Sequence, residues 1–186
     1  MANSDRYAHE EVPSTYGYPR GYRVKTLAKQ VAVLCELFPQ LDGSIYGTLD
    51  EFPDGAEGWF AIPRWDLLAP IYYDAVEIVL AKLATTRPFT NWWRAEQLGL
   101  DRLQQFLLIV VRMNQFAVAQ NHRDILIIPA QFGKHHAGRS YRRAREVFAP
   151  NEFGLGAFEV ACMLLTHPER LQVYEDLWID CPGNVY

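Results

Sequence analysis

The stretch DILIIPAQ, residues 124–131, constrains the fold of this chain more than any other feature of the sequence. Its continuous apolar, β-branched run is typical of a strand that a sheet buries on both faces. Proline has no N–H group to donate to a sheet ladder, so Pro129 is expected to end the pairing. Two further apolar runs, WFAIP (59–63) and LWIDCP (177–182), also reach a proline and are predicted to be short strands.

Segments with apolar residues at helical spacing lie between and around these runs. They are residues 22–38, 66–87, 99–120, 138–148 and 154–165, with one more turn at 168–177. Strands that alternate with helices are compatible with parallel pairing through right-handed crossovers. The sequence therefore predicts an α+β or α/β fold, in which a small, mostly buried sheet of about three strands packs with about five helices.

The N-terminal region differs in character from the rest of the chain. Residues 1–22 carry Tyr7, Tyr16, Tyr18 and Tyr22 among Pro, Gly and Ser, with no periodicity. We expect an extended, Tyr-rich arm there. Residues 23–186 are expected to form a single globular domain, since a chain of 186 residues is long enough to bury one core.

Composition and charge exclude several classes of protein. No run of 18 apolar residues exists, which argues against a membrane span, and the first 20 residues lack the apolar segment of a secretory signal. A net charge of −4 argues against a nucleic-acid-binding surface. Cys35, Cys162 and Cys181 show no C-x-x-C spacing, so the sequence predicts a reducing cytoplasm and no disulfide framework. Cys35 and Cys162 are expected to be buried, since each lies on an apolar helical face.

The proline-terminated strand ends predict a candidate site. If the strands are parallel neighbours, these ends lie side by side, where open sheets with helical crossovers bind ligands. The residues expected there are Arg64 and Trp65 after the first strand, Gln131, Lys134, His135 and His136 after the second, Arg139 and Ser140 at the next helix start, and Asp180 and Cys181 after the third. Free N–H groups at a helix start favour a negative charge, so a small anionic ligand is the expected partner.

The turn FGKHHAGRS, residues 132–140, differs by one residue from the phosphate-loop pattern G-x-x-x-x-G-K-[ST]. Arg139 replaces the lysine of that pattern, and four residues separate the apolar run from Gly133, which argues against a nucleotide-binding loop. We expect an ordered strand-to-helix turn instead. Gly133 and Gly138 would supply its backbone freedom, and Ser140 or a nearby amide would satisfy the helix-start donors.

His135 and His136 within this turn have more than one interpretation. One ring of such a neighbouring pair is expected to face inward and the other to face solvent. Hydrogen bonding to the loop backbone is the plainer role, and a nucleophilic pair of a histidine with Cys181 is the alternative. The chain has no H-E-x-x-H motif or comparable cluster, so neither a metal nor a cofactor is expected.

The helix after the turn carries Arg139, Arg142, Arg143 and Glu146 on one face. A solvated face with a weak Arg142–Glu146 pair is one interpretation. A patch that binds anions and continues from Lys134 is the other, because four arginines within seven residues are unusual on an acidic chain.

Several phrases of the sequence resemble parts of bacterial proteins of unknown function. They are GAEGWFAIPRW, GRSYRRAREVF, NEFGLGAF, LLTHPERL and DLWIDCPG, and together they span roughly residues 55–183. The resemblance implies a bacterial, cytoplasmic protein and carries no catalytic residue with it.

The leading functional hypothesis is a domain that binds a small molecule or anion at the strand ends and the 133–140 turn. The first alternative is a protein-interaction module, most simply a homodimer, joined through the aromatic arm and the apolar run FLLIVV (106–111). The second alternative is a hydrolase or transferase that uses Cys181 or one of His135 and His136.

Overall fold

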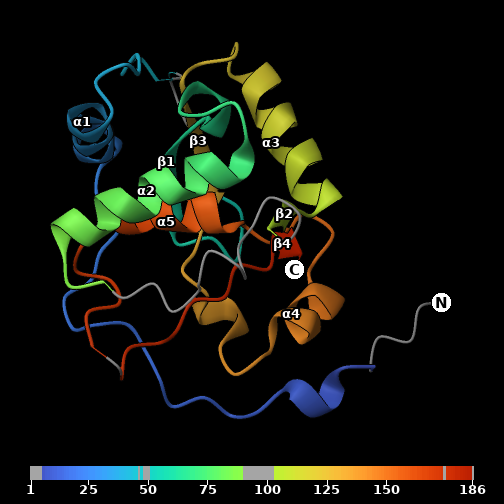
Figure 1. Ribbon diagram of the computed structural model, residues 1–186. Coiled ribbons are helices and arrows are strands. Elements are labelled where there is room, and N and C mark those ends of the chain that lie inside the picture. The colour runs from blue at the N-terminus through green and yellow to red at the C-terminus, as the bar shows by residue number, and fades with distance from the viewer. Residues whose placement is uncertain (1–5, 46, 48–50, 90–102, 174, 186) are drawn as a thin grey trace.

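Two antiparallel strands lie at the centre of the fold (Figure 1). In the computed structural model, which describes residues 6–45, 47, 51–89, 103–173 and 175–185, strand β1 spans Gly58–Pro63 and strand β3 spans Ile125–Ala130. Gly58 pairs with Ala130 at one end and Pro63 with Ile125 at the other. Both strands predicted from the apolar runs are therefore confirmed, and all but one residue of each is buried. The expectation that Pro129 ends the pairing is wrong, because the register continues through Pro129 to Ala130.

The expected parallel arrangement is wrong. The described part of the connection from β1 to β3 contains the helices α2 (Tyr72–Thr86) and α3 (Leu107–Ala119), and the connection returns the chain to the end of the sheet that it left. The first residue of β3 therefore pairs with the last residue of β1, and β3 runs against β1. The residues after β1 and the residues after β3 consequently lie at opposite ends of the sheet.

The third predicted strand is also absent. Residues 177–182 form no regular element and pair with no strand among the described residues. A two-residue strand, β4 (Asn184–Val185), follows them and pairs antiparallel with β2 (Gln104–Gln105) in a separate small sheet. The described residues of 168–177 form no helix either, and Pro168 lies instead in a single hydrogen-bonded turn, in which Arg170 N donates to His167 O (3.0 Å). Helices packed on small antiparallel sheets make this an α+β fold, which is one of the two predicted fold classes.

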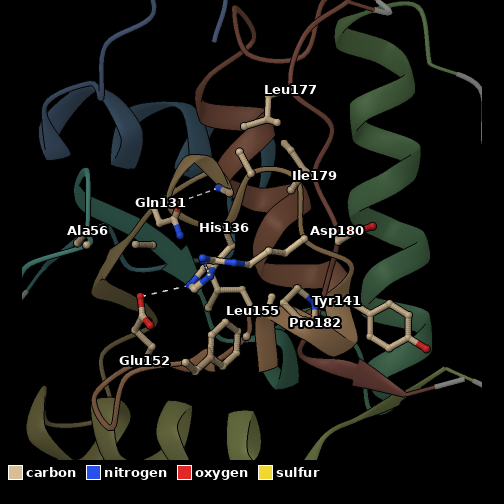
Figure 2. A pocket seen from close by; sticks show the side chains of 18 of the residues that line it. Ala56, Gln131, His136, Tyr141, Glu152, Leu155, Leu177, Ile179, Asp180 and Pro182 are labelled. Carbon is tan, nitrogen blue, oxygen red and sulfur yellow. Dashed lines mark hydrogen bonds and ion pairs between the residues drawn. The ribbon is translucent and has the colours of Figure 1, made fainter. Parts of the chain in front are cut away.

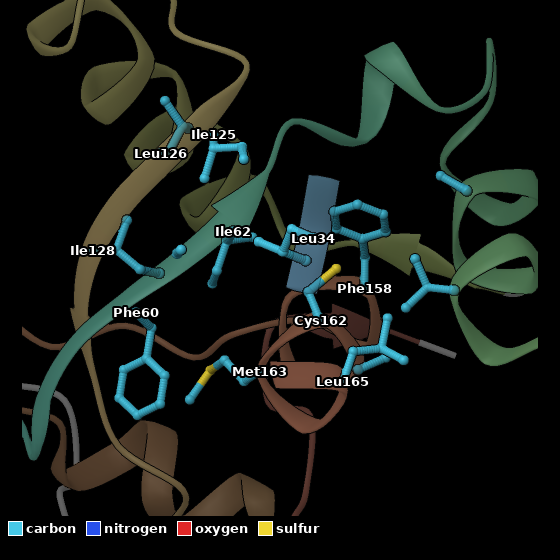
Figure 3. Close-up of a cluster of buried hydrophobic side chains, with 14 of the residues drawn as sticks. Leu34, Phe60, Ile62, Ile125, Leu126, Ile128, Phe158, Cys162, Met163 and Leu165 are labelled. Carbon is cyan, nitrogen blue, oxygen red and sulfur yellow. The ribbon is translucent and has the colours of Figure 1, made fainter. Parts of the chain in front are cut away.

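Helices α1 (Leu27–Leu37), α5 (Ala157–Thr166) and α3 pack on the central sheet, with α3 against β3 and α2 in a layer beyond α5. Helices α1 and α5 both contact β1, and α2 lies along α5 (Figure 1). The fully buried side chains of Leu34, Phe60, Ile62, Cys162 and Met163 meet in the core between them (Figure 3). The buried Cys162 confirms one of the two expected core thiols, whereas Cys35 is half-buried at the edge of this cluster.

Two buried glutamines complete the hydrogen bonding of the two-stranded sheet. On the outer edge of β1, Gln30 donates through Nε2 to Trp59 O (2.9 Å) and accepts through Oε1 from Ala61 N (2.9 Å). On the outer edge of β3, Gln120 makes the same pair of bonds with Ile127 N and O, each 2.8 Å long. Each amide thus stands in for the peptide group of a missing neighbouring strand, which lets the strands be buried.

The N-terminal arm lies along helix α4 (Tyr141–Val147), below the sheet in the view of Figure 1. Its described part begins at Arg6 and includes a short 3-10 helix, η1 (Ala8–Glu10). Ser140 N donates to Glu10 O (3.1 Å), and Val12 N donates to Gly138 O (2.8 Å), so the arm is bonded to the backbone at the start of α4. Among the described residues, no helix is both long and apolar enough to cross a membrane.

Candidate ligand-binding cleft

A cleft of about 460 Å³ opens between the N-terminal arm, the end of β3 and the C-terminal segment (Figure 2). Its walls come from residues 12–16 of the arm, 53–56 before β1, most of 129–139 around the turn, α3, α4, 151–155, and most of 177–182. Most of its lining is apolar, including Phe116, Phe148, Leu155, Leu177 and Ile179. The polar side chains Gln131, His136 and Glu152 lie together on one wall (Figure 2).

The turn that supplies this polar wall has the predicted form. Gly133 (φ 95°) and Gly138 (φ 83°) both adopt left-handed backbone conformations that favour glycine. Ser140 is the N-cap of α4, and its side chain accepts from Arg143 N. A Cβ atom at position 138 would lie 2.0 Å from Val12 O. Gly138 is therefore required both by its own conformation and by the close approach of the arm.

His136 faces inward from the 3-10 turn η3 (Lys134–His136), with only 12% of its side chain exposed. Its Nδ1 accepts from Arg139 Nη1 (3.1 Å), because a guanidinium can only donate. The proton of the neutral ring therefore sits on Nε2, which lies 3.4 Å from Glu152 Oε1. Burial in the cleft wall lowers the pKa of His136 and keeps the ring neutral near pH 7.

His135 points to the outside of the same turn, and 53% of its side chain is exposed. The expectation of one inward and one outward ring is confirmed. The two rings nevertheless meet edge to face with centroids 4.8 Å apart, and His135 Nε2 lies 3.6 Å from the same Glu152 oxygen. Glu152 was missed at the sequence level, because nothing in the pattern of residues 149–156 indicates that its carboxylate returns to the histidine pair.

Gln131 and Asp180 are two further predicted residues that the cleft brings together. Gln131 Oε1 accepts from Gly133 N (2.8 Å) and His135 N (3.1 Å), so its NH₂ group is the part that is left to face the cleft. Asp180 lines the opposite side on the 177–182 segment (Figure 2). Partial desolvation there raises the pKa of Asp180.

Two predicted residues, Arg64 and Trp65, lie at the far end of the sheet, away from the cleft. Arg64 forms an ion pair with Asp66 and donates to His122 O, and Trp65 packs edge to face on Tyr72. Grouping Arg64 and Trp65 with Gln131 was wrong, because it depended on parallel strands.

Lys134, Ser140 and Cys181 lie near the cleft but do not line it. The Lys134 ammonium sits over the Tyr18 ring (5.6 Å), and the Ser140 hydroxyl donates to a Glu10 carboxylate oxygen. Burial raises the pKa of the Cys181 thiol to about 12, so the thiolate that a nucleophile requires is not favoured.

The arginine-rich face of α4 is occupied by carboxylates of the chain itself. Glu11 accepts from Arg139 Nε and from Arg143 Nε, each at 2.9 Å, and Glu10 accepts from Arg142. The expected Arg142–Glu146 pair is replaced by Arg143 with Glu146, at 2.9 Å. The arginines therefore hold the N-terminal arm, an internal partner that the sequence pattern could not distinguish from an external anion.

Comparison of the chain with protein-family models, with curated proteins and with solved structures gave no match.

Proposed function

We propose that the cleft binds a small organic molecule with an apolar body and a head group that accepts hydrogen bonds. The cleft volume of about 460 Å³ falls within the range of about 300–1,000 Å³ that small-molecule sites occupy. A mostly apolar lining with a few convergent polar groups is also the usual composition of such sites. The observation that carries the proposal is that Gln131, His136 and Arg139 all line this apolar cleft, with Arg139 hydrogen-bonded to His136.

Apart from the Glu152 carboxylate, which faces the histidine pair, Gln131 and Arg139 offer the cleft donors that are free among the described residues, and this supports an acceptor head group such as a carboxylate. Gln131 offers its NH₂ group, because its oxygen is already used by two backbone N–H groups. Arg139 uses Nε for Glu11 and Nη1 for His136, and its Nη2 is bonded to no group among the described residues. Since Glu11 shares the charge of Arg139, a singly charged carboxylate fits this wall better than a polyphosphate.

Thermal-shift screening tests the proposal, using aromatic and branched aliphatic carboxylates together with the primary amide of each acid. We expect several acids to raise the melting temperature, and the matched amides to raise it less. Replacing the cleft residue Ala137 with Trp should abolish the shift, because the indole fills the mouth. The control Ala119→Trp, at an exposed position of α3, should retain it.

A second pair of variants tests the head-group assignment. Arg139→Met removes the guanidinium but keeps an apolar stem, and we expect the preference for acid over amide to disappear. Arg142→Met is the matched control, because Arg142 also pairs with an arm carboxylate but does not line the cleft. Equal shifts in Ala137→Trp and the parent protein would place binding elsewhere and overturn the proposal.

We also propose that the protein forms a homodimer and that it acts in the bacterial cytoplasm. One further observation favours the homodimer. Helix α3 exposes an apolar face, with Leu107 at 74% and Val118 at 63% exposure, and Val111 between them. A second copy of the chain could cover this face. Light scattering at high micromolar concentration should give a dimer mass that Val111→Glu reduces to a monomer mass, and a monomer mass for the parent would overturn this role.

A further inference from the structure

We infer that His135, His136 and Glu152 form a binding site for a divalent transition-metal ion such as Zn²⁺. One ligand atom from each of these three side chains lies within 4.8 Å of the other two. Two imidazole nitrogens and one carboxylate oxygen are a donor set that Zn²⁺ commonly takes. This inference goes beyond the proposed binding of an organic molecule and does not depend on it.

The separations of Glu152 from each of the two histidines match the dimensions of a zinc site, and the two imidazole nitrogens lie within 4.8 Å of each other. Tetrahedral geometry with Zn–N and Zn–O bonds of about 2.0–2.1 Å places neighbouring ligand atoms about 3.3 Å apart. Glu152 Oε1 lies 3.4 Å from His136 Nε2 and 3.6 Å from His135 Nε2. These separations exceed good hydrogen-bond lengths, so an ion bridging the three atoms would satisfy them better than direct contact does.

A second observation, made at the His136 ring, supports the site. Its Nε2 is buried and makes no hydrogen bond among the described residues. A buried polar nitrogen without a partner is uncommon in folded proteins and calls for a missing ligand, ion or water. Since His136 and Glu152 line the cleft, a fourth coordination position would face the cavity, as in zinc sites that hold a water or a substrate.

The charge of Arg139 and its hydrogen bond to His136 both disfavour a metal ion on His136, and this provides a specific test. A metal on Nε2 requires the ring proton on Nδ1, and Arg139 Nη1 now donates to that atom. Zinc binding must therefore turn Nη1 away, while the bond from Nε to Glu11 (2.9 Å) can keep Arg139 in place. Removing the guanidinium should also remove its repulsion of the ion, so Arg139→Met should bind zinc more tightly, by about tenfold.

Calorimetric titration of the untagged protein with Zn²⁺ tests the site, with Co²⁺ absorption as the report on coordination geometry. We expect one ion per chain and a tetrahedral Co²⁺ spectrum. His136→Ala and Glu152→Gln should each weaken zinc binding by at least about tenfold. The control His122→Asn changes an exposed histidine at the other end of β3 and should leave the affinity unchanged, since Asn tolerates the left-handed backbone there.

Three results would overturn the inference. The first is a parent protein that binds no zinc at micromolar concentration. The second is zinc binding that is unchanged in both His136→Ala and Glu152→Gln. The third is an equal loss of zinc affinity in the control His122→Asn. Thermal melting of each variant without metal separates loss of the site from loss of the fold. Because Arg139→Met is expected to gain affinity, a general destabilisation cannot imitate the full pattern.

Discussion

At the scale of single residues, the central sheet depends on two side-chain amides. Gln30 and Gln120 are almost fully buried, and each satisfies one N–H and one C=O on a strand edge that has no neighbouring strand. The helical spacing around both positions could be seen in the sequence, but their role could not. A glutamine on a predicted helix is ordinarily a surface residue, and only the packing brings its amide to a strand.

Replacing Gln120 with Met should destabilise the protein by about 2–4 kcal/mol. The volume is nearly kept, but Ile127 N and O become buried groups without partners, and each such group costs about 1–3 kcal/mol. The free energy of unfolding from urea titration measures the effect. The control Gln115→Met, at an exposed position of α3, should change it by less than about 0.5 kcal/mol, and an equal effect at both positions would contradict the edge-capping role.

Glu159 should make stability fall as the pH rises from about 4.5 to 7. It is fully buried at the start of α5, and burial raises its pKa from 4.5 to about 7. In this window the folded state holds a proton that the unfolded state has released, so unfolding becomes easier with rising pH, by about 3 kcal/mol in total. Glu159→Gln keeps an oxygen that can accept from Gly156 N (3.1 Å). In this variant the free energy of unfolding, measured by urea titration, should no longer fall by this amount between pH 4.5 and 7. A parallel pH dependence in parent and variant would refute the assignment.

At the scale of elements, the sequence predicted β1, β3 and the principal helices but not the direction of the strands. Runs of apolar residues indicate where strands occur, whereas direction depends on how the intervening helices pack. The approach of residue 154 to the C-terminal segment also depends on packing, because a Cβ at Gly154 would lie 2.6 Å from Pro182 C. Long-range partners such as Pro182, Glu152 and the arm carboxylates leave no local pattern, so the site could be predicted only in part.

The arm should detach from α4 when its carboxylates lose their charge. In Glu11→Gln, both Arg139 and Arg143 lose a charged acceptor, so the arm should become sensitive to proteolysis and exchange its amide hydrogens faster. High salt should have a similar effect on the parent protein, because these pairs lie near the surface. Limited proteolysis with mass spectrometry at residues 6–18 measures both, with Glu77→Gln on the exposed face of α2 as the control. An arm equally protected in Glu11→Gln would show that its backbone bonds suffice.

At the scale of the whole molecule, the chain uses its own N-terminus to build a wall of the cleft. The arm is fixed by the arginines of α4, the turn after β3 provides the polar groups, and the 177–182 segment closes the opposite side. Residues of the turn and Asp180 do line the same cleft, but the reason offered for their proximity, parallel strand ends, was wrong. The cleft instead forms because the arm and the C-terminal segment both pass the end of β3.

The central claim is that ligands bind at the 133–140 turn, and an NMR titration with the most stabilising carboxylate tests it most directly. We predict saturable shifts of the Gln131 side-chain amide and the backbone amides of Gly133, His136 and Gly138. The amide of Arg64, at the other end of the sheet, should not move. Shifts confined to the exposed face of α3, or centred on Arg64, would contradict the account.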